Sequence, residues 1–301
     1  PSRGLGDVYK RQGFIGFGEA AYNISLGLKG EGVTGIIAYD KMAGDPVMGP
    51  MVAGRAAEAE AALLDTAKEV AEQADVIFGA VPSSFALDVC DEIKDVLCEG
   101  KIYADVSAST PAVKEKIWEA VRDTGVKFVD AAMLGSLPKD KHQVPITASG
   151  NGADTLKEMM TPYGMKITTA GEKAGAASAI KLVRSIYMKG IASLMIEMLQ
   201  AADAYDVSEE VVSSIAKSMD NIPFTSHLDR LVTGTAIHCH RRAAELKGSI
   251  AMLEECGFSS VMTKAAKERM EDMEQFDFAA RYVEKKPDGW NEIIQVMKEE
   301  K

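Results

Sequence analysis

The sequence predicts an α/β domain with a parallel sheet, followed by an all-α domain, with one long interdomain helix joining the two. Short β-branched runs alternate with Ala/Glu/Lys-rich stretches at first, and these strand signals stop after TTAGEKAGAAS. Such alternation is typical of βαβ units and therefore of a parallel sheet. A chain of 301 residues is long enough to bury two such cores.

The expected elements follow in order along the chain. Strands are expected at 13–15, 35–39, 76–81, 102–106, 127–130 and 144–148, and amphipathic helices at 56–73 and 111–124. One helix without proline is expected over 172–205, and further helices over 208–219, 224–255, 259–273 and 288–300. We place the domain boundary near residue 171, which predicts a sheet domain over 13–171 and a helical domain over 172–301.

The first residues, PSRGLGDVYKRQ, do not fit the strand that follows them. A central parallel strand is covered on both faces and is nearly continuous in apolar residues. Here Lys10, Arg11 and Gln12 stand directly before the apolar run GFI. The string resembles translated adapter or read-end sequence, so we expect residues 1–12 to be a non-native leader and native sequence to begin near Gly13.

Composition narrows the class of partner. With 47% hydrophobic and 26% charged residues, the chain resembles a soluble globular protein. A net charge of −11 disfavours a nucleic-acid partner, which needs dense Lys/Arg patches. No apolar run approaches the roughly 20 residues of a membrane span, and the N-terminal segment lacks the apolar core of a signal peptide. We therefore expect a cytoplasmic protein.

The cysteines and histidines do not form a recognisable metal site. Cys90, Cys98, Cys239 and Cys256 show no Cys-x-x-Cys pairing, so reduced thiols are expected. In the sequence IHCHRR, neighbouring residues on a helix point about 100° apart, and no further ligands stand at zinc-like spacing. No bound metal is expected.

A glycine-rich turn follows the first strand. Gly16-x-Gly18-x-x-Ala21 lets the backbone approach a pyrophosphate at the start of a helix. Asp40 ends the next strand, near the spacing of about 20 residues at which an acid meets the adenosine ribose. Its carboxylate favours NAD over NADP, although Lys41 can reverse that preference. For this pattern alone, a purely structural βα turn remains the alternative.

The cofactor is therefore expected to be NAD or NADP, with a preference for NAD. The predicted cofactor-binding residues are Gly16, Phe17, Gly18, Glu19, Ala20, Asp40, Lys41, Val81 and Pro82.

Three downstream stretches predict a reaction pocket. YADVSASTPAV offers hydroxyls before Pro111, which suits a helix start, and FVDAAMLGSLP ends in a Gly-Ser turn. Helix capping and an ordinary loop are the alternatives for these two stretches. In GEKAGAASAIKLVRS, Lys181 and Ser185 share one helix face beside small residues. A lysine that faces a pocket at a domain junction can titrate near neutrality and act as a general acid/base, although most helical lysines are solvated surface residues.

These segments, in this order, resemble the β-hydroxyacid dehydrogenase family, which includes 3-hydroxyisobutyrate and tartronate-semialdehyde enzymes and is related to 6-phosphogluconate dehydrogenase. The matching segments are GFIGFGEAA, DVSASTP, DAAMLGS and GEKAGAASAIKLVRS, and with the helical domain they cover nearly the whole chain. IKLVRSIYMKG and HCHRRAAEL resemble a less characterised, phosphogluconate-dehydrogenase-like branch.

The resemblance implies a Rossmann-type sheet domain and hydride transfer between the nicotinamide and a small 3-hydroxy acid or sugar acid, or its oxo or semialdehyde counterpart. It implies that Lys181 moves the hydroxyl proton. By motif position, the substrate-binding residues are Ser107, Leu134, Gly135, Ser136 and Ser185. Ala108, the turn 134–136 and Ser185 depart from the family's Thr, Ser-Gly-Gly and Asn, so the pocket is expected to be remodelled.

Two other functions remain open. An imine reductase shares this architecture by family resemblance, but its members commonly carry another residue in place of Lys181. A non-catalytic nucleotide sensor would explain the altered pocket, but not the retained Lys181 and hydroxyl-rich turn. Family resemblance and the apolar helical half also predict a homodimer or homotetramer formed through the C-terminal helices.

Overall fold

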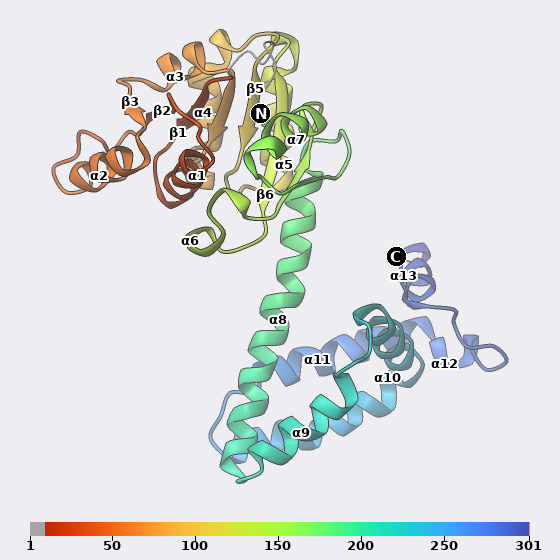
Figure 1. Ribbon diagram of the computed structural model, residues 1–301. Helices are drawn as coiled ribbons and strands as arrows, with labels where there is room; N and C mark the ends of the chain where they lie inside the picture. Colours follow the sequence, from red (N-terminus) through yellow and green to blue (C-terminus); the bar gives the residue numbers. More distant parts are fainter. Residues whose placement is uncertain (1–9, 301) are drawn as a thin grey trace. The chain divides into compact units, whose positions relative to one another are not determined.

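A computed structural model describes residues 10–300 of the chain (Figure 1). The residues form two compact units that divide between Ser185 and Ile186, inside one long helix. The predicted boundary near residue 171 and the predicted leader stay predictions, and residues 1–9 of that leader lie outside the described residues.

The first unit is built on an eight-stranded sheet with strand order β3-β2-β1-β4-β5-β6-β7-β8. The strands are β1 Gln12–Ile15, β2 Ile37–Tyr39, β3 Ala62–Leu63, β4 Val76–Gly79, β5 Ile102–Asp105, β6 Lys127–Met133, β7 Ile146–Ser149 and β8 Ile167–Thr169. All neighbours pair in parallel except β6 and β7, which are antiparallel. The predicted α/β class is confirmed, whereas β3, β8 and the reversal of β7 were not predicted.

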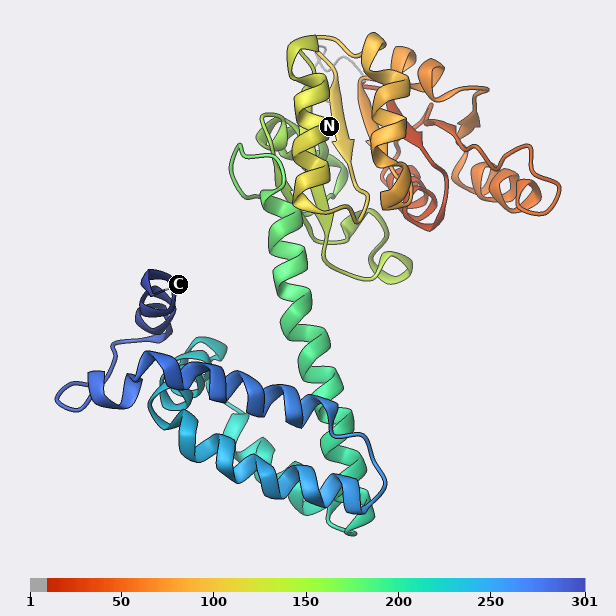
Figure 2. The same cartoon turned by 180° about the vertical axis from the view of Figure 1, so that it is seen from behind.

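Helices cover both faces of this sheet (Figures 1 and 2). They are α1 Glu19–Gly30, α2 Gly49–Ala59, α3 Ala67–Gln73, α4 Ala86–Ile93, α5 Pro111–Val121, α6 Leu137–Asp140 and α7 Ala153–Met160. One buried cluster joins the sheet to α1, α2 and α7, and another joins it to α3, α4 and α5. Short 3-10 turns lie at η1 Ser83–Phe85, η2 Lys94–Val96, η3 Arg122–Thr124, η4 Lys141–Gln143 and η5 Thr161–Tyr163.

The helix predicted over 56–73 is wrong, because the chain leaves helical geometry inside it. Glu60 ends α2 in the left-handed region, with φ 53°, and β3 follows. Thr66 then starts α3 by accepting a hydrogen bond from the backbone amide of Glu69 at 3.1 Å. The hydroxyl of an N-cap residue begins a new helix, so α2 and α3 are separate although the Ala/Glu composition is similar in both.

Gln12 lies within β1, one residue before the predicted start of that strand. It pairs with Val76 and is 1% exposed. Its Nε2 donates to the carbonyl oxygen of Lys10 at 2.6 Å, whereas its buried Oε1 has no hydrogen-bond partner within the described part of the chain. A buried amide oxygen without a partner destabilises the folded state, so this position is a poor match between side chain and strand.

The second unit is helical, as predicted. Its elements are the later part of α8 Ala176–Ala204, then α9 Ser208–Met219, α10 Phe224–Glu255, α11 Val261–Asp272, η6 Met273–Phe276, α12 Phe278–Arg281 and α13 Trp290–Glu299. Its core contains Ala236, Cys239, Phe276, Phe278 and Ile293. Among residues 10–300, no helix has the length and apolar character needed to cross a membrane.

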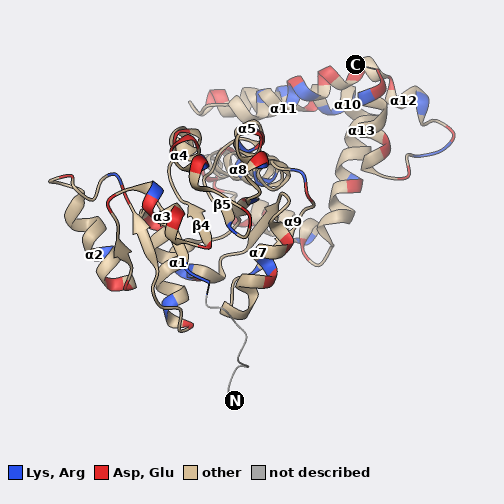
Figure 3. Cartoon of the chain, turned by 90° about the horizontal axis from the view of Figure 1, so that it is seen from above, with Lys and Arg blue, Asp and Glu red and all other residues tan. Residues whose placement is uncertain are grey.

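Charges of both signs lie along α11, as Figure 3 shows for the charged residues of the chain. Lys267 pairs with Glu271 at 2.6 Å, and Arg269 pairs with Asp272 at 3.7 Å. Both pairs have the spacing at which helix side chains meet. These two pairs lie within α11, whereas Lys264 of the same helix pairs with Glu254 of α10.

The start of α11 is held by a buried acid of α8. Glu197 is 4% exposed and accepts hydrogen bonds from the backbone amides of Met262 and Thr263 at 2.9 and 2.8 Å, and from the Thr263 hydroxyl at 2.6 Å. Burial raises the pKa of Glu197, but these hydrogen bonds together lower it below its ordinary value. The carboxylate form is therefore favoured in the folded state.

Glu197→Gln is expected to lower the free energy of unfolding of the helical unit by about 1 to 2 kcal/mol at pH 7. Because folding lowers this pKa, the stabilisation is complete above the unfolded value of about 4.3 and is lost as the pH falls further. The difference between wild type and variant should therefore shrink as the pH is lowered below about 4. Urea unfolding, followed by Trp290 fluorescence in a Trp118→Phe background, measures it.

The control for this prediction is Glu210→Gln, which removes an exposed carboxylate from α9. Equal unfolding midpoints for the two variants at pH 7 would contradict the role given to Glu197.

Candidate functional site

The turn between β1 and α1 has the geometry expected of a dinucleotide site. Gly16 has φ 87°, a conformation that side chains strongly disfavour, and a Cβ added there would lie 2.6 Å from the Ala80 carbonyl oxygen. Gly18 precedes α1, and a Cβ added to it would meet no atom within 4 Å. The fold itself therefore requires glycine at 16, while the space at Gly18 is open to a ligand approaching the helix start.

Asp40 connects this turn to the end of β2. Its carboxylate accepts hydrogen bonds from the backbone amide of Phe17 at 2.6 Å and from that of Met42 at 2.8 Å. Gly16 also donates to the Tyr39 carbonyl oxygen at 2.7 Å. The predicted ribose acid thus lies directly at the glycine turn, and it also holds that turn in shape.

The other predicted cofactor residues lie at the same edge of the sheet. Glu19 and Ala20 form the first turn of α1, and exposed Lys41 follows Asp40. Val81 and Pro82 follow β4, the strand beside β1, and are half-buried and exposed respectively. In doubly wound sheets, ligands bind outside the carboxyl ends of strands at the point where the strand order reverses, here between β1 and β4.

Substitutions at the two glycines should affect different properties, stability at Gly16 and nucleotide binding at Gly18. Gly16→Ala is expected to destabilise the sheet unit by about 1 to 3 kcal/mol or more, because of its backbone strain and its clash with Ala80. Gly18→Ala should unfold like wild type but bind NADH at least tenfold more weakly, because its methyl group enters the space of the pyrophosphate. Thermal unfolding and NADH fluorescence titration measure the two effects. A Gly18→Ala protein with wild-type affinity would contradict this placement.

A second group of polar residues follows β5. Asp105 is fully buried, and its carboxylate accepts from the Ser107 backbone amide and from the Ser107 hydroxyl, both at 3.0 Å. The Ser107 and Ser109 hydroxyl oxygens are 2.7 Å apart. Ser107, the predicted substrate residue, is thus 6% exposed, and a network beneath it determines its orientation.

A buried lysine lies at the centre of this network. Lys114, on α5, is 0% exposed, and its Nζ donates to the carbonyl oxygens of Asp105 and Ser107 at 2.8 and 3.0 Å. The same Nζ lies 3.0 Å from Asp105 Oδ2 and 3.5 Å from Asp130 Oδ1. One ammonium therefore joins the carboxylates of two neighbouring strands, β5 and β6.

Asp130 extends the network to the start of α8. Its carboxylate accepts from the Ser178 backbone amide at 2.8 Å and from the Ser178 hydroxyl at 2.7 Å. Ser149, at the end of β7, accepts from the Ala177 backbone amide at 3.0 Å. A carboxylate and a hydroxyl thus bind two amides of the first helical turn, where an acid also interacts favourably with the helix dipole.

Lys181 lies on α8 one turn beyond this anchored start, three and four residues after Ser178 and Ala177. Its side chain is half-buried and contacts other groups of the chain. Ser185 follows one turn later and is also half-buried. The structure therefore connects Ser107 to the helix that carries Lys181.

The turn that contains Leu134, Gly135 and Ser136 is already bonded within the chain. The Leu134 backbone amide donates to the Pro145 carbonyl oxygen at 2.7 Å, and the Ser136 amide donates to the Asp140 carboxylate at 3.3 Å. The Ser136 amide of the Gly135-Ser136 turn is therefore bonded within the chain rather than accessible, because the loop to β7 closes on itself. Its part in substrate binding stays a prediction.

Neighbours of the network remain protonated. Burial raises the pKa of the Cys90 thiol to about 12. Burial, together with the charge of Asp105, raises the pKa of the Tyr103 hydroxyl. These two groups are thus neutral core residues at neutral pH rather than nucleophiles.

Sequence reasoning missed Lys114 and the bonds of Ser178, both of which interact with Asp130. One signal was present in the helix pattern: Lys114, Ile117 and Val121 share the buried face of α5, so a lysine stands where the periodicity calls for an apolar residue. Asp130 lies in the segment FVDAAMLGSLP, but the sequence pattern gave it no part in the site.

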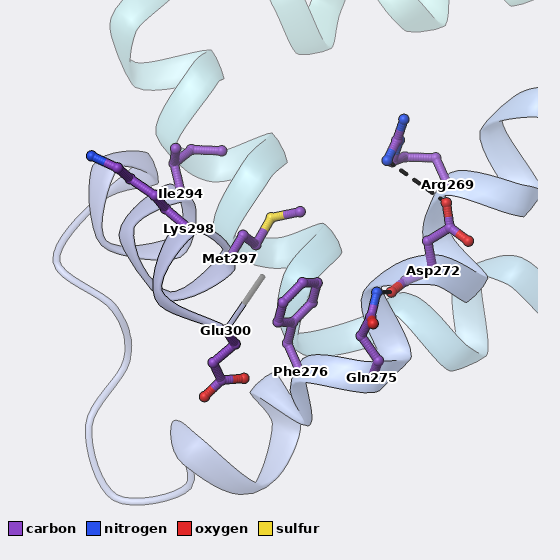
Figure 4. Close-up of a pocket in the computed structure, with 8 residues that line it drawn as sticks. All are labelled: Arg269, Asp272, Gln275, Phe276, Ile294, Met297, Lys298 and Glu300. Carbon is purple, nitrogen blue, oxygen red and sulfur yellow. Dashed lines mark hydrogen bonds and ion pairs between the residues drawn. The ribbon is translucent and has the colours of Figure 1, made fainter.

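The helical unit contains a separate hollow of about 620 Å³ (Figure 4). It lies between the end of α11, η6 and α13, and Arg269 at its rim pairs with Asp272 at 3.7 Å. Its lining residues run from Arg269 to Glu300, well beyond the predicted site residues in sequence.

Comparisons with known proteins agree with the nucleotide-binding geometry. Residues 11–171 match the family described as the NAD binding domain of 6-phosphogluconate dehydrogenase, and residues 202–273 match a domain of unknown function, DUF1932. An uncharacterized 28.5 kDa protein in the 7S RNA 5′ region of Methanothermus fervidus is 27% identical over 272 residues, which cover 88% of this chain and 99% of that protein.

Solved structures agree as well. Conserved protein MTH1747, described as structurally similar to 3-hydroxyacid dehydrogenases, is 28% identical with a TM-score of 0.59, covering 88% of this chain and 97% of that one. An imine reductase from Myxococcus stipitatus in complex with NADP+ shares the fold, with a TM-score of 0.68 at 17% identity, covering 91% of this chain and 100% of that one. The resemblance seen in the sequence is thus confirmed, and the chain belongs to the family that carries the NAD-binding domain of 6-phosphogluconate dehydrogenase.

Proposed function

We propose that this chain is an NAD(P)-dependent oxidoreductase of the cytoplasm, with Lys181 as its general acid/base. Its substrate would be a small 3-hydroxy acid or sugar acid, or the oxo or semialdehyde counterpart. The observation that carries this proposal is the continuous network from Ser107 through Lys114 to Ser178, which joins a predicted substrate residue to the helix of Lys181.

The residues at the β1–α1 turn fit the cofactor. The open space at Gly18 and the amides at the start of α1 suit a pyrophosphate, and Asp40 at the end of β2 suits the ribose hydroxyls. When bound, the nicotinamide supplies the hydride acceptor or donor. The carboxylate of Asp40 would repel a 2′-phosphate, so we expect NAD to bind more tightly than NADP.

The chain's own residues would transfer the proton and orient the substrate. During oxidation, the neutral amine of Lys181 takes the hydroxyl proton as the carbon–hydrogen bond breaks and its electron pair leaves with the hydride. During reduction, the ammonium of Lys181 returns a proton to the carbonyl oxygen. Ser107 would bind the carboxylate end of the substrate in this arrangement.

A substrate panel tests the proposal. Purified protein is mixed with NADH or NADPH and oxo acids, with NAD+ or NADP+ and hydroxy acids, and with cyclic imines, while absorbance at the reduced nicotinamide band is followed. Turnover of a hydroxy acid or its oxo counterpart, faster with NAD(H), is the expected result. Turnover of imines alone would instead identify an imine reductase. Tight nucleotide binding without any turnover would identify a nucleotide sensor.

We also propose that the protein forms a homodimer or homotetramer through its C-terminal helices. Ile186 and Ile196, ten residues apart on α8, are 74% and 61% exposed, and exposed apolar surface of this kind can mark an interface between protein chains. Light scattering of the purified protein should give a mass of two or four chains, and a monomeric mass would refute the assembly.

A further inference from the structure

Lys114 is a fully buried charged group of the sheet unit that takes no direct part in the proposed reaction. Its ammonium is enclosed by two carbonyl oxygens and by the carboxylates of Asp105 and Asp130, both of which are also buried. Burying an ion pair is costly, and well-packed apolar residues often serve stability equally well. Stability alone therefore does not account for an ammonium at this place.

The two carboxylates lead to two different parts of the candidate site. Asp105 binds the amide and hydroxyl of Ser107. Asp130 binds the amide and hydroxyl of Ser178, at the start of α8. In Figure 1, α5, β5, β6 and the start of α8 lie together, and Lys114 is the group that connects both branches.

The position of Lys181 depends on the second branch. Lys181 lies three residues after Ser178, so any shift or rotation of the first turn of α8 moves the origin of its side chain. Reacting groups must keep near-attack geometry, and a displacement of about 1 Å can cost on the order of a hundredfold in rate.

We propose that Lys114 is a positioning residue. Through Asp105 and Asp130, it holds the Ser107 hydroxyl and the first turn of α8 in a fixed relation, and so orients Lys181 towards the substrate that Ser107 binds. This inference rests on the proposed function, since it assigns Lys181 and Ser107 the roles given above.

The test distinguishes an effect on the position of Lys181 from an effect on folding, by using a variant in which the net charge of the buried cluster is unchanged. Lys114→Met alone leaves two buried carboxylates without their cation. Lys114→Met combined with Asp105→Asn restores the net charge of the cluster but not the connection between its branches. Lys116→Met is the matched control, because it removes an exposed lysine from the same helix.

We expect the double variant to bind NADH with a Kd within about twofold of wild type, because the β1–α1 turn is untouched. Its kcat should fall by about tenfold to a hundredfold, with a smaller change in KM. Lys116→Met should match wild type in all three constants. A folded double variant with wild-type kcat would overturn the proposal.

Ser178→Ala keeps the test decisive if the double variant does not fold. It removes one hydroxyl at the far end of the network and leaves the ammonium and both carboxylates in place. A fall in kcat of about threefold or more, with unchanged thermal unfolding, is expected. Wild-type kcat in Ser178→Ala would refute the positioning role.

A second measurement needs no substrate. Competitive acetylation, quantified by mass spectrometry, gives the reactivity of Lys181 relative to the exposed Lys68 of α3. In the double variant or in Ser178→Ala, the relative reactivity of Lys181 should change at least threefold, and an unchanged value would count against the inference. If no substrate is ever turned over, the proposed function fails, yet a change in Lys181 reactivity would still show that the network positions this amine.

Discussion

Lys181→Ala is expected to lower kcat by a factor of about a hundred to ten thousand, the range that a positioned general acid or base contributes. The nucleotide site lies at the β1–α1 turn, and the α8 anchors at Ala177 and Ser178 are backbone amides and a hydroxyl that the change leaves intact. The Kd for NADH and the unfolding temperature should therefore remain close to wild type. Stopped-flow and steady-state assays on the substrate found in the panel measure kcat directly.

Chemical rescue sharpens this prediction. A small primary amine such as methylamine should restore part of the lost rate in Lys181→Ala, because it supplies the missing proton carrier in the space of the deleted side chain. Lys189→Ala, at an exposed position on the same helix, is the matched control and should retain full activity. Undiminished turnover by Lys181→Ala would eliminate Lys181 as the acid/base.

Lys114→Met is expected to lower the free energy of unfolding of the sheet unit by about 3 to 5 kcal/mol, the cost typical of breaking a buried ion pair by removing one partner. The loss arises because two carboxylates, Asp105 and Asp130, remain buried on neighbouring strands without the cation that pairs with both. Methionine preserves the length of the lysine stem, so a cavity contributes little to the effect.

The two tryptophans of the chain allow this measurement in one unit at a time. Trp118 lies on α5, stacked on Phe128 with ring centroids 6.4 Å apart, so in a Trp290→Phe background its fluorescence reports on the sheet unit. Urea unfolding of Lys114→Met should show a clearly lower midpoint than Lys116→Met. If the two midpoints coincide, the buried cluster does not stabilise the fold.

Several elements were predictable because their signals are local. The helices Ser208–Met219 and Phe224–Glu255 match the expected ranges, since apolar periodicity without proline marks a helix regardless of its surroundings. The turn at Gly16 was equally visible, and its positive φ explains why glycine is needed there.

Other elements depended on the sheet. β7 runs antiparallel because the connection from β6 contains only the four-residue helix α6 and a 3-10 turn, which is less than the crossover helix that a parallel return usually uses. β3 is two residues long, too short for any pattern to predict, and it exists because it pairs with β2.

The sequence by itself determined the class of fold, the nucleotide turn and the choice of Lys181 as the candidate acid/base. Each of these depends on short motifs whose residues lie close together along the chain. Only the tertiary structure revealed the buried network to which we assign the orientation of that lysine. Lys114, Asp130 and Ser178 meet from a helix, a strand and a second helix, and the bond from Ser178 to Asp130 spans 48 residues of sequence. Whether a charge is buried beside its partners depends on which strands become neighbours in the sheet. Hydrophobic periodicity along the chain predicts helices and strands but not how the strands pair.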